Sequence, residues 1–196
     1  MVHPAIILWL SLAVDRLLGD PPNRLHPTAY LGRFIGWWGR PSLYPRYLER
    51  AVGVGGVAVT SLLFAAPFVL FAHYAPLILL IIGAPVLLKF CFAWRSLEEH
   101  VTAVRNALAT DLSRGREEVQ MLVSRETSSL SRVEVLSAAY ESMSENLVDS
   151  IVSPLFYFAL FGLGGAAFFR AVNTADAMLG YRDERVRIGW CAARLD

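Results

Sequence analysis

Two apolar runs of membrane-spanning length, residues 51–72 and 75–94, constrain this chain more than any other feature. A helix needs about 20 apolar residues to cross the hydrocarbon core of a bilayer, and each run has roughly that length. The 196-residue sequence is 55% hydrophobic with a mean hydropathy of +0.45, which is too apolar for an ordinary soluble domain. The sequence therefore predicts an all-α, polytopic integral membrane protein.

Two further segments complete a single membrane domain over residues 1–196. Residues 2–18 are apolar and lack both a basic start and a small-residue cleavage site, so they predict a retained spanning helix rather than a signal peptide. Residues 151–180 begin as an apolar helix but contain a Gly-Leu-Gly-Gly cluster at 162–165, which permits a reversal. We expect a re-entrant helical hairpin that turns near Leu163.

The distribution of arginine sets the expected topology. Residues 19–50 and 95–132 are rich in arginine, whereas the connector at residues 73–74 has no Lys or Arg. The positive-inside rule places both basic segments in the cytoplasm, and the hairpin returns the basic tail to the same side. We expect a multi-pass protein of the cell membrane with a cytoplasmic active face and amphipathic cytoplasmic helices over residues 95–150. The net charge of +1 gives no argument for a nucleic-acid partner.

A helix that begins at Ser131 carries the strongest candidate chemistry. Ser131 and Glu134 have the spacing of a capping box. An apolar stripe at helical spacing follows: Val133, Leu136, Tyr140, Met143 and Leu147. Glu141, Glu145 and Asp149 fall on the opposite face, with no basic residue beside them on that helix. This is either a solvated acidic face or a site for a metal or a cationic substrate, because unpaired carboxylates repel one another and their oxygens suit Mg²⁺.

The expected hairpin adds polar residues to this helix. Its turn returns Asp149 and Asp176 to a similar depth, and Asn173 shares a helical face with Asp176. These residues are either functional or engaged in capping and interhelical hydrogen bonds. Arg170 lies partway along the returning arm and needs a partner or a path to the interface.

Individually weaker candidates lie outside the acidic helix and the hairpin. Asp20 and His26 occupy a proline-rich loop, where either a direct role or none is compatible with their spacing. Arg125 could hold a phosphate or remain solvated. Three features are predicted to be structural only: an interfacial ion pair or snorkelling at Asp15 and Arg16, a snorkelling Lys89 without a role, and a second capping box at Ser96 and Glu99.

Six motifs in matching order over nearly the whole chain resemble one family. They are D-R-L-L-G-D-P-P at 15–22, H-P at 26–27, E-S-M-S-E-N-L-V-D at 141–149, S-P-L-F-Y at 153–157, N-T-A-D-A-M-L-G-Y-R at 173–182 and A-A-R-L-D at 192–196. The chain is similar to adenosylcobinamide-phosphate synthase, the CobD/CbiB membrane enzymes of cobalamin biosynthesis. The resemblance implies a reaction that joins a propionate carboxyl of adenosylcobyric acid to (R)-1-aminopropan-2-ol or its phosphate, forming an amide. Family members continue past an A-R-L-D-D signature, whereas this chain stops at its first Asp, so we expect a fragment or a short form.

The chemistry of that reaction assigns roles to the candidate residues. Amide formation in water is uphill, so we expect ATP with Mg²⁺ to activate the carboxylate. No Walker-type or dinucleotide-binding motif is present, and nucleotide binding is inferred from thermodynamics alone. The expected metal cage is Glu141, Glu145, Asp149 and Asp176. The expected catalytic residues are Glu141, Glu145, His26 and Asp20, with His26 or Glu145 deprotonating the amine. The expected substrate-binding residues are Asn146, Asn173, Arg125, Tyr181 and Arg182.

Two other classes of function are open at this point. One is a non-catalytic corrinoid transporter subunit or membrane scaffold, and the other is a relative recruited to signalling. Transport predicts polar residues throughout the spans, but the runs at 51–72 and 75–94 are nearly free of ionisable groups, which favours an enzyme. The expected partners are adenosylcobyric acid, aminopropanol or its phosphate and membrane lipid, with other cobalamin-assembly membrane enzymes as candidates.

Overall fold

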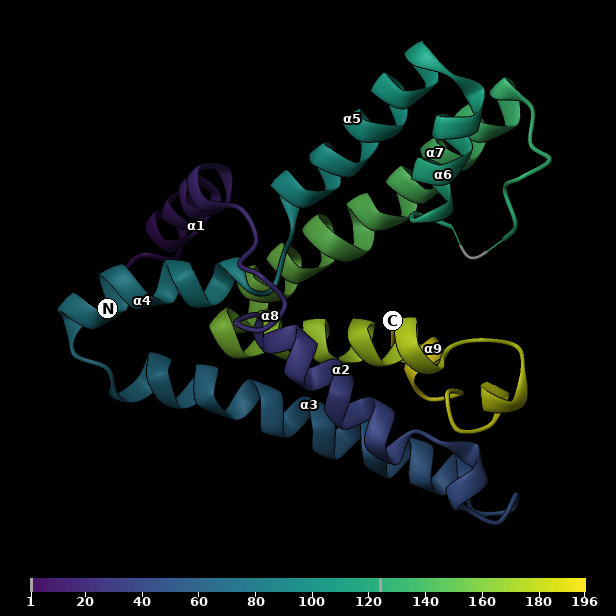
Figure 1. Cartoon of the computed structure of the whole chain (residues 1–196). Helices are drawn as coiled ribbons and strands as arrows, with labels where there is room; N and C mark the ends of the chain where they lie inside the picture. Colours follow the sequence, from purple (N-terminus) through teal and green to yellow (C-terminus); the bar gives the residue numbers. More distant parts are fainter. Residues whose placement is uncertain (1, 124) are drawn as a thin grey trace.

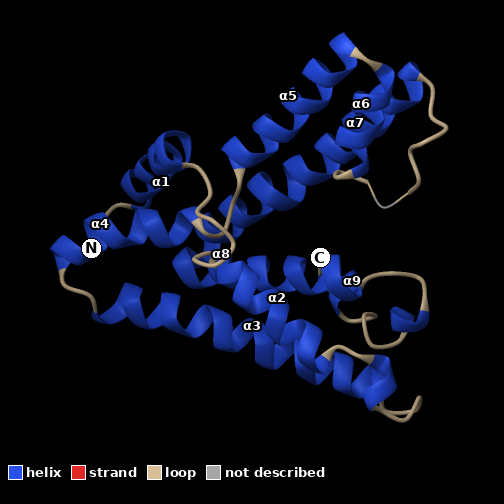
Figure 2. Ribbon diagram, in the orientation of Figure 1, coloured by secondary structure: helices blue, strands red, loops and turns tan. Residues whose placement is uncertain are grey.

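A computed structural model describes residues 2–123 and 125–196, and that part of the chain contains helices but no strand (Figure 2). The predicted all-α fold is confirmed. The α-helices are α1 (Pro4–Leu18), α2 (Pro27–Trp38), α3 (Glu49–Tyr74), α4 (Leu77–Lys89), α5 (Trp94–Thr110), α6 (Leu112–Gln120), α7 (Arg132–Leu147), α8 (Ser153–Leu179) and α9 (Ala192–Leu195). Two 3₁₀ turns, η1 (Pro41–Leu43) and η3 (Glu184–Val186), and a π-helical turn, η2 (Val148–Val152), complete the order.

The helices form a layer and an arm (Figure 1). In the layer, α3 packs along α8, α2 contacts both of them, and α1 packs on α4. In the arm, α5, α6 and α7 pack against one another and project away from the layer. The turn η2 joins α7 to α8, so the acidic helix of the arm continues directly into the apolar layer.

Three helical stretches are long and apolar enough to cross a membrane by length and composition: Glu49–Tyr74, Leu77–Thr110 and Arg132–Leu179. The first is the single helix α3, the second joins α4 to α5, and the third runs from α7 through η2 into α8. Only about a third of their most apolar residues are buried inside the protein, so large side chains such as Leu62, Leu63 and Ile78 face outward. This surface suits lipid better than water. The 15-residue α1 is not among the three stretches, and its assignment as a span stays a prediction.

The reversal predicted in the last apolar segment occurs inside α8. Gly162 has φ 66° and ψ −158°, a combination that is essentially restricted to glycine. The rings of Tyr157 and Phe169 stack with their centroids 5.1 Å apart, whereas a straight helix would separate these positions by about 18 Å. α8 therefore consists of an outgoing arm, residues 153–161, and a returning arm, residues 163–179, which fold back on each other at Gly162. This is next to the predicted turn at Leu163.

We expect Gly162→Ala to lower the free energy of unfolding by about 1–3 kcal/mol. No atom lies within 4 Å of an added Cβ, so the loss comes from backbone strain and not from a clash. Gly55→Ala is the matched control, because Gly55 also has open space around its Cβ position but lies in the regular helix α3. There alanine should be neutral or stabilising by up to about 1 kcal/mol. Reversible unfolding in detergent checks both changes, and equal effects would contradict the strained turn.

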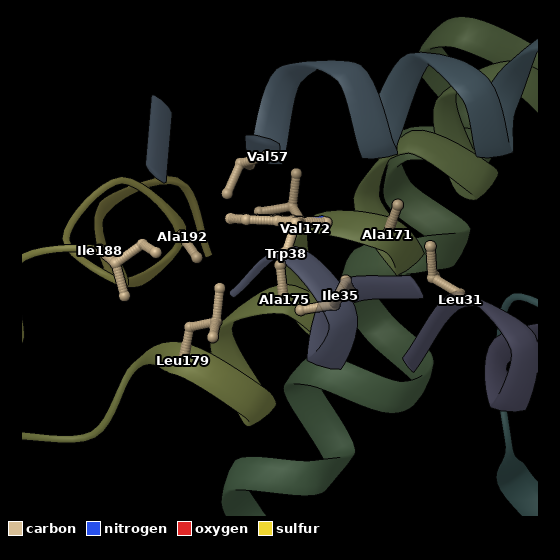
Figure 3. Packing of buried hydrophobic residues seen from close by; sticks show 10 residues of the cluster. All are labelled: Leu31, Ile35, Trp38, Val57, Ala171, Val172, Ala175, Leu179, Ile188 and Ala192. Atoms are coloured by element: carbon tan, nitrogen blue, oxygen red, sulfur yellow. The ribbon is translucent and has the colours of Figure 1, made fainter. Parts of the chain in front are cut away.

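The layer has its own hydrophobic core where α2 meets α3 and α8 (Figure 3). Leu31, Ile35 and Trp38 lie one turn apart along α2 and are buried against residues of the returning arm of α8. The indole of Trp38 donates a hydrogen bond to Thr60 Oγ1 of α3 at 3.1 Å. Gly56 of α3 packs against this ring so closely that a Cβ would displace it. These contacts hold α2 against α3 and α8, and they thereby place the end of the loop that leads into α2.

The arm corrects two predictions. The buried face of α7 consists of Val135, Ala138, Ala139 and Ser142, and the predicted apolar stripe through Val133, Tyr140 and Leu147 is exposed. Small side chains let α7 approach α5 and α6 closely, so packing selects a different face from the one with the largest apolar groups. The capping box at Ser131 and Glu134 is confirmed. The box predicted at Ser96 and Glu99 is wrong, because α5 already begins at Trp94.

Candidate functional site

A cluster of charged side chains fills the point where the arm joins the layer, and we call it the polar junction. It is built from the end of α1 and the loop after it, the end of α4, the turn η2, the returning arm of α8 and the chain end at α9 (Figure 1). Its members are Asp15, Asp20, His26, Lys89, Asp149, Arg170, Asn173, Asp176 and Asp196.

Lys89 is the buried centre of one half of the junction. Its side chain is 3% exposed, and its ammonium forms ion pairs with Asp15, at 2.8 Å, and with Asp20. The prediction that Lys89 snorkels to the interface is therefore wrong. The side chain turns inward because two carboxylates from the start of the chain converge on the end of α4, a long-range contact that local sequence cannot reveal.

Asp15 has a second partner that fixes the base of the arm. Its Oδ2 accepts the backbone N–H of Arg95 at 2.9 Å, which caps the first turn of α5. In return the Arg95 guanidinium donates to the carbonyls of Arg16 and Leu17 at the end of α1, both at 3.3 Å. Arg16 itself pairs with Glu98 on the surface. The sequence predicted an interfacial ion pair or snorkelling at these two residues. The structure buries Asp15 and leaves Arg16 exposed in an ion pair with another helix.

Asp20 and His26, both predicted to be catalytic, lie together in this half. Nε2 of His26 is 3.8 Å from Asp20 Oδ1, close enough for electrostatic attraction but too long for a direct hydrogen bond. Nδ1 accepts the backbone N–H of Thr28 at 3.3 Å and so caps α2. That contact favours the tautomer with the proton on Nε2, facing Asp20. His26 is therefore arranged to position the loop, and its role as a base stays a prediction.

The pH dependence of stability should report on Asp20. Burial alone would raise the pKa of this carboxyl, but the nearby His26 and Lys89 outweigh burial and hold the pKa well below its ordinary value. Asp20 then binds more protons in the unfolded chain, so its contribution is complete above about pH 4 and is lost as the pH falls further. We expect Asp20→Asn to reduce the fall in melting temperature between pH 5 and pH 3 in detergent. An unchanged slope would show that Asp20 is not held as an ion.

Arg170 connects the half of the junction around Lys89 with a second half, which contains Asp149, Asn173, Asp176 and Asp196. Its guanidinium lies near enough to Cys91, Asp20 and Asp196 for electrostatic interaction, and Nη1 donates to Asn173 Oδ1 at 3.4 Å. Asn173 Nδ2 donates in turn to Asp196 Oδ2 at 3.4 Å. Burial raises the pKa of Asp196, and the Asn173 hydrogen bond and the Arg170 charge act in the opposite direction. Asn173, predicted to bind substrate, is thereby placed inside the junction.

Asp149 and Asp176 lie near enough to each other across the hairpin for their charges to interact, in keeping with the turn predicted at the glycine cluster. The charge of Asp149 acts on Asp176, and the charges of Asp196 and Glu145 act on Asp149. One carboxylate oxygen of Asp176, Oδ1, is buried without a hydrogen-bond partner in the described part of the chain. Like charges that act on one another in this way repel unless a cation joins them.

The π-helical turn that carries Asp149 has a local cause. Pro154 has no N–H and cannot bond the carbonyl of Ser150 four residues earlier. That carbonyl instead accepts the backbone N–H of Ala93 at 3.0 Å, just before α5. Such turns often occur at functional sites, and this one ties the acidic helix to the base of the arm beside Lys89.

Glu141 and Glu145 lie farther along the arm. With Arg125, Leu122 and Ser142 they line a cavity of about 240 Å³. Arg125 Nη2 forms an ion pair with Glu141 Oε2 at 2.9 Å, and both side chains are exposed. The predicted ladder of unpaired carboxylates is therefore wrong at Glu141, because a loop residue that is distant in sequence supplies the missing cation.

The predicted metal cage is not assembled in this structure. Within residues 2–123 and 125–196, no three Asp, Glu, His or Cys side chains lie close enough together to hold a metal ion. Carboxylate oxygens suit Mg²⁺, but Glu141 is drawn to Arg125 while Asp149 and Asp176 belong to the junction. The four residues do not fit one resident ion.

Three predicted substrate contacts lie outside the junction or are already engaged. Tyr181 and Arg182 are exposed in the loop after α8, where Tyr181 stacks under the guanidinium of Arg185. Asn146 uses its amide nitrogen on the carbonyl of Ser142 at 2.8 Å. Sequence reasoning assigned no site role to Asp15, Lys89 or Arg170, although Lys89 is the chain's single lysine among 18 basic residues and could have been singled out for that reason.

Comparison with known proteins agrees with the motif resemblance. The model of the CobD/Cbib protein family matches residues 8–196. A "Probable cobalamin biosynthesis protein CobD" of Thermococcus kodakarensis is 44% identical over the whole chain, which covers 66% of that relative. The "Cobalamin biosynthesis protein CobD" of Dehalococcoides mccartyi is 35% identical over 97% of the chain and 64% of the relative.

The chain thus spans about two thirds of the length of these relatives. No solved structure gave a significant match. Because the family match and the relatives' similarity both extend over nearly the entire sequence, the chain belongs to the CobD/CbiB family.

Proposed function

We propose that the protein acts in cobalamin biosynthesis by forming an amide between the propionate carboxyl of adenosylcobyric acid and aminopropanol or its phosphate. The observation that carries this proposal is the polar junction, where carboxylates, an amide and two cations gather at one end of the apolar helices. The relatives' names place them in the same pathway.

The two sides of the junction suit the two reactants. An amino alcohol is an ammonium ion at neutral pH, and the unpaired carboxylates Asp149 and Asp176 would attract it and accept its proton. Asn173 and Arg170 offer donors to the carboxyl group that becomes the amide. Holding both groups in one geometry removes much of the entropic barrier to their reaction.

Condensation also needs an activated carboxyl group. A nucleoside triphosphate with its Mg²⁺ is the expected co-substrate, so that the carboxyl oxygen leaves on phosphate when the amine nitrogen attacks the acyl carbon. The active face is proposed to be cytoplasmic in the cell membrane, since the nucleotide is supplied there and the basic loops follow the positive-inside rule.

The rival function is corrinoid transport. A transport path needs polar groups along the spans, but the outward faces of α3 and α4 are apolar, and Lys89 lies at the very end of α4. This distribution favours catalysis on one membrane face.

Complementation in a bacterium that lacks its own family member tests the proposal. Cells that express the chain should grow under cobalamin-requiring conditions when given cobyric acid, and should grow equally well with cobinamide. Growth with cobinamide but never with cobyric acid, despite chain in the membrane fraction, would contradict synthesis by this polypeptide. Loss of growth on both would indicate a defect in corrinoid uptake and not in amide formation.

A further inference from the structure

Arg170 and Lys89 are the two cations of the polar junction, and their surroundings differ. Lys89 is matched by two carboxylates within ion-pair distance, Asp15 and Asp20. Arg170 makes no ion pair within 4 Å in the described part of the chain. Its Nε is fully buried without a hydrogen-bond partner, and its guanidinium donates one long bond, to Asn173.

A guanidinium has five N–H donors, and leaving them unpaired away from water costs free energy. The carboxylates of Asp20 and Asp196 act on Arg170 only at longer range. Asp20 is bound by Lys89, which it shares with Asp15, and Asp196 is engaged by Asn173. Arg170 therefore keeps unpaired N–H donors, because the carboxylates nearest to it are held by other partners.

The backbone holds the guanidinium where it is. Arg170 follows Phe169, which stacks on Tyr157 across the hairpin, and its carbonyl accepts the hydroxyl of Thr174 at 2.7 Å. Neighbouring Ala171 and Val172 are buried in the core against α2 and α3. These contacts fix the backbone that carries Arg170, and the hydrogen bond to Asn173 restrains the guanidinium, which lowers the entropy lost when an anion binds.

We propose that Arg170 is the oxyanion receptor of this protein and that it binds a carboxylate or phosphate group of the ligand through its planar fork. Asn173 orients the guanidinium, and Lys89 keeps the nearby Asp20 from competing for it. This assignment moves anion binding from Arg125, which is paired with Glu141, and from the exposed Arg182 to Arg170. That the bound anion is the propionate of the substrate rests on the proposed function. The anion site itself does not.

Equilibrium binding of small anions to the protein in lipid nanodiscs tests the proposal. The probes are inorganic phosphate, propionate and adenosylcobyric acid, measured by calorimetry with wild type, Arg170→Lys, Arg170→Met and the exposed control Arg105→Met. Wild type and the control should bind at least one small anion saturably. Arg170→Met should bind it at least about 10-fold more weakly, with Arg170→Lys in between because lysine keeps the charge and loses the fork.

The outcomes separate this proposal from the proposed function. Preference for phosphate or for propionate tells which oxyanion the receptor takes, and either supports the proposal. Arg170-dependent anion binding without amide synthesis would leave the receptor standing while the proposed reaction fell. Absence of saturable anion binding by wild type, or unchanged binding in folded Arg170→Met, overturns the receptor. If Arg170→Met does not fold, unchanged affinity in Arg170→Lys does the same.

Discussion

Replacing Lys89 with methionine should lower the free energy of unfolding by about 3–5 kcal/mol, the usual cost of removing one partner of a buried ion pair. Methionine has nearly the same length and suits the apolar surroundings, so the loss comes from Asp15 and not from a cavity. Asp15 is 2% exposed, and without the ammonium its charge is buried with only the Arg95 N–H as a partner. Reversible unfolding in detergent or bicelles measures the change.

Two further variants show whether the buried charge is the cause. Arg105→Met removes an exposed cation from α5 and should change stability by less than about 0.5 kcal/mol. Adding Asp15→Asn to Lys89→Met should recover part of the loss, since the buried charge disappears together with its partner. A Lys89→Met protein within about 1 kcal/mol of wild type would contradict the buried triad.

Asp176→Asn should decrease amide synthesis by about 10²–10⁴-fold, the range expected when a group that takes a proton in the reaction is removed. The carboxylate has a buried oxygen without a partner and lies near Asp149, so it is poised to receive a cationic amine and not to hold the fold together. Asparagine keeps the shape and removes a repulsive charge. Stability should therefore stay equal or rise while activity falls, the opposite of a structural residue.

The matched control is Glu117→Gln on α6, which removes an exposed carboxylate at the far end of the arm and should leave synthesis within about 2-fold. The assay is product formation by membranes that contain equal amounts of each variant. If Asp176→Asn retains wild-type turnover, or loses it only together with stability, Asp176 does not act on the substrate.

The sequence correctly predicted those features of the fold that depend on the local pattern of residues. The apolar run at 51–72 became α3, the capping box at Ser131 formed, and the glycine cluster reversed the chain at Gly162. The approach of Asp149 to Asp176, close enough for their charges to interact, is in keeping with residue counting along the two arms of the turn. These features need only helical geometry and the conformational freedom of glycine.

The errors concern contacts between segments that are distant in the sequence. Lys89 looked like an ordinary residue near the end of a span, because nothing around it reveals that Asp15 and Asp20 return to it. Glu141 looked unpaired because Arg125 lies in another segment. On α7, the spacing of large apolar residues was a poorer guide to the buried face than the small residues that allow close packing.

The most direct test of the central claim is the conversion of adenosylcobyric acid to its aminopropanol amide by membranes that contain this chain, with ATP and Mg²⁺. Reactions with aminopropanol and with its phosphate are followed by mass spectrometry of the corrinoid, and omission of nucleotide serves as the control. The account predicts a nucleotide-dependent amide from one of the two amines. Unchanged adenosylcobyric acid with both amines, from protein shown to be folded in the membrane, would contradict it.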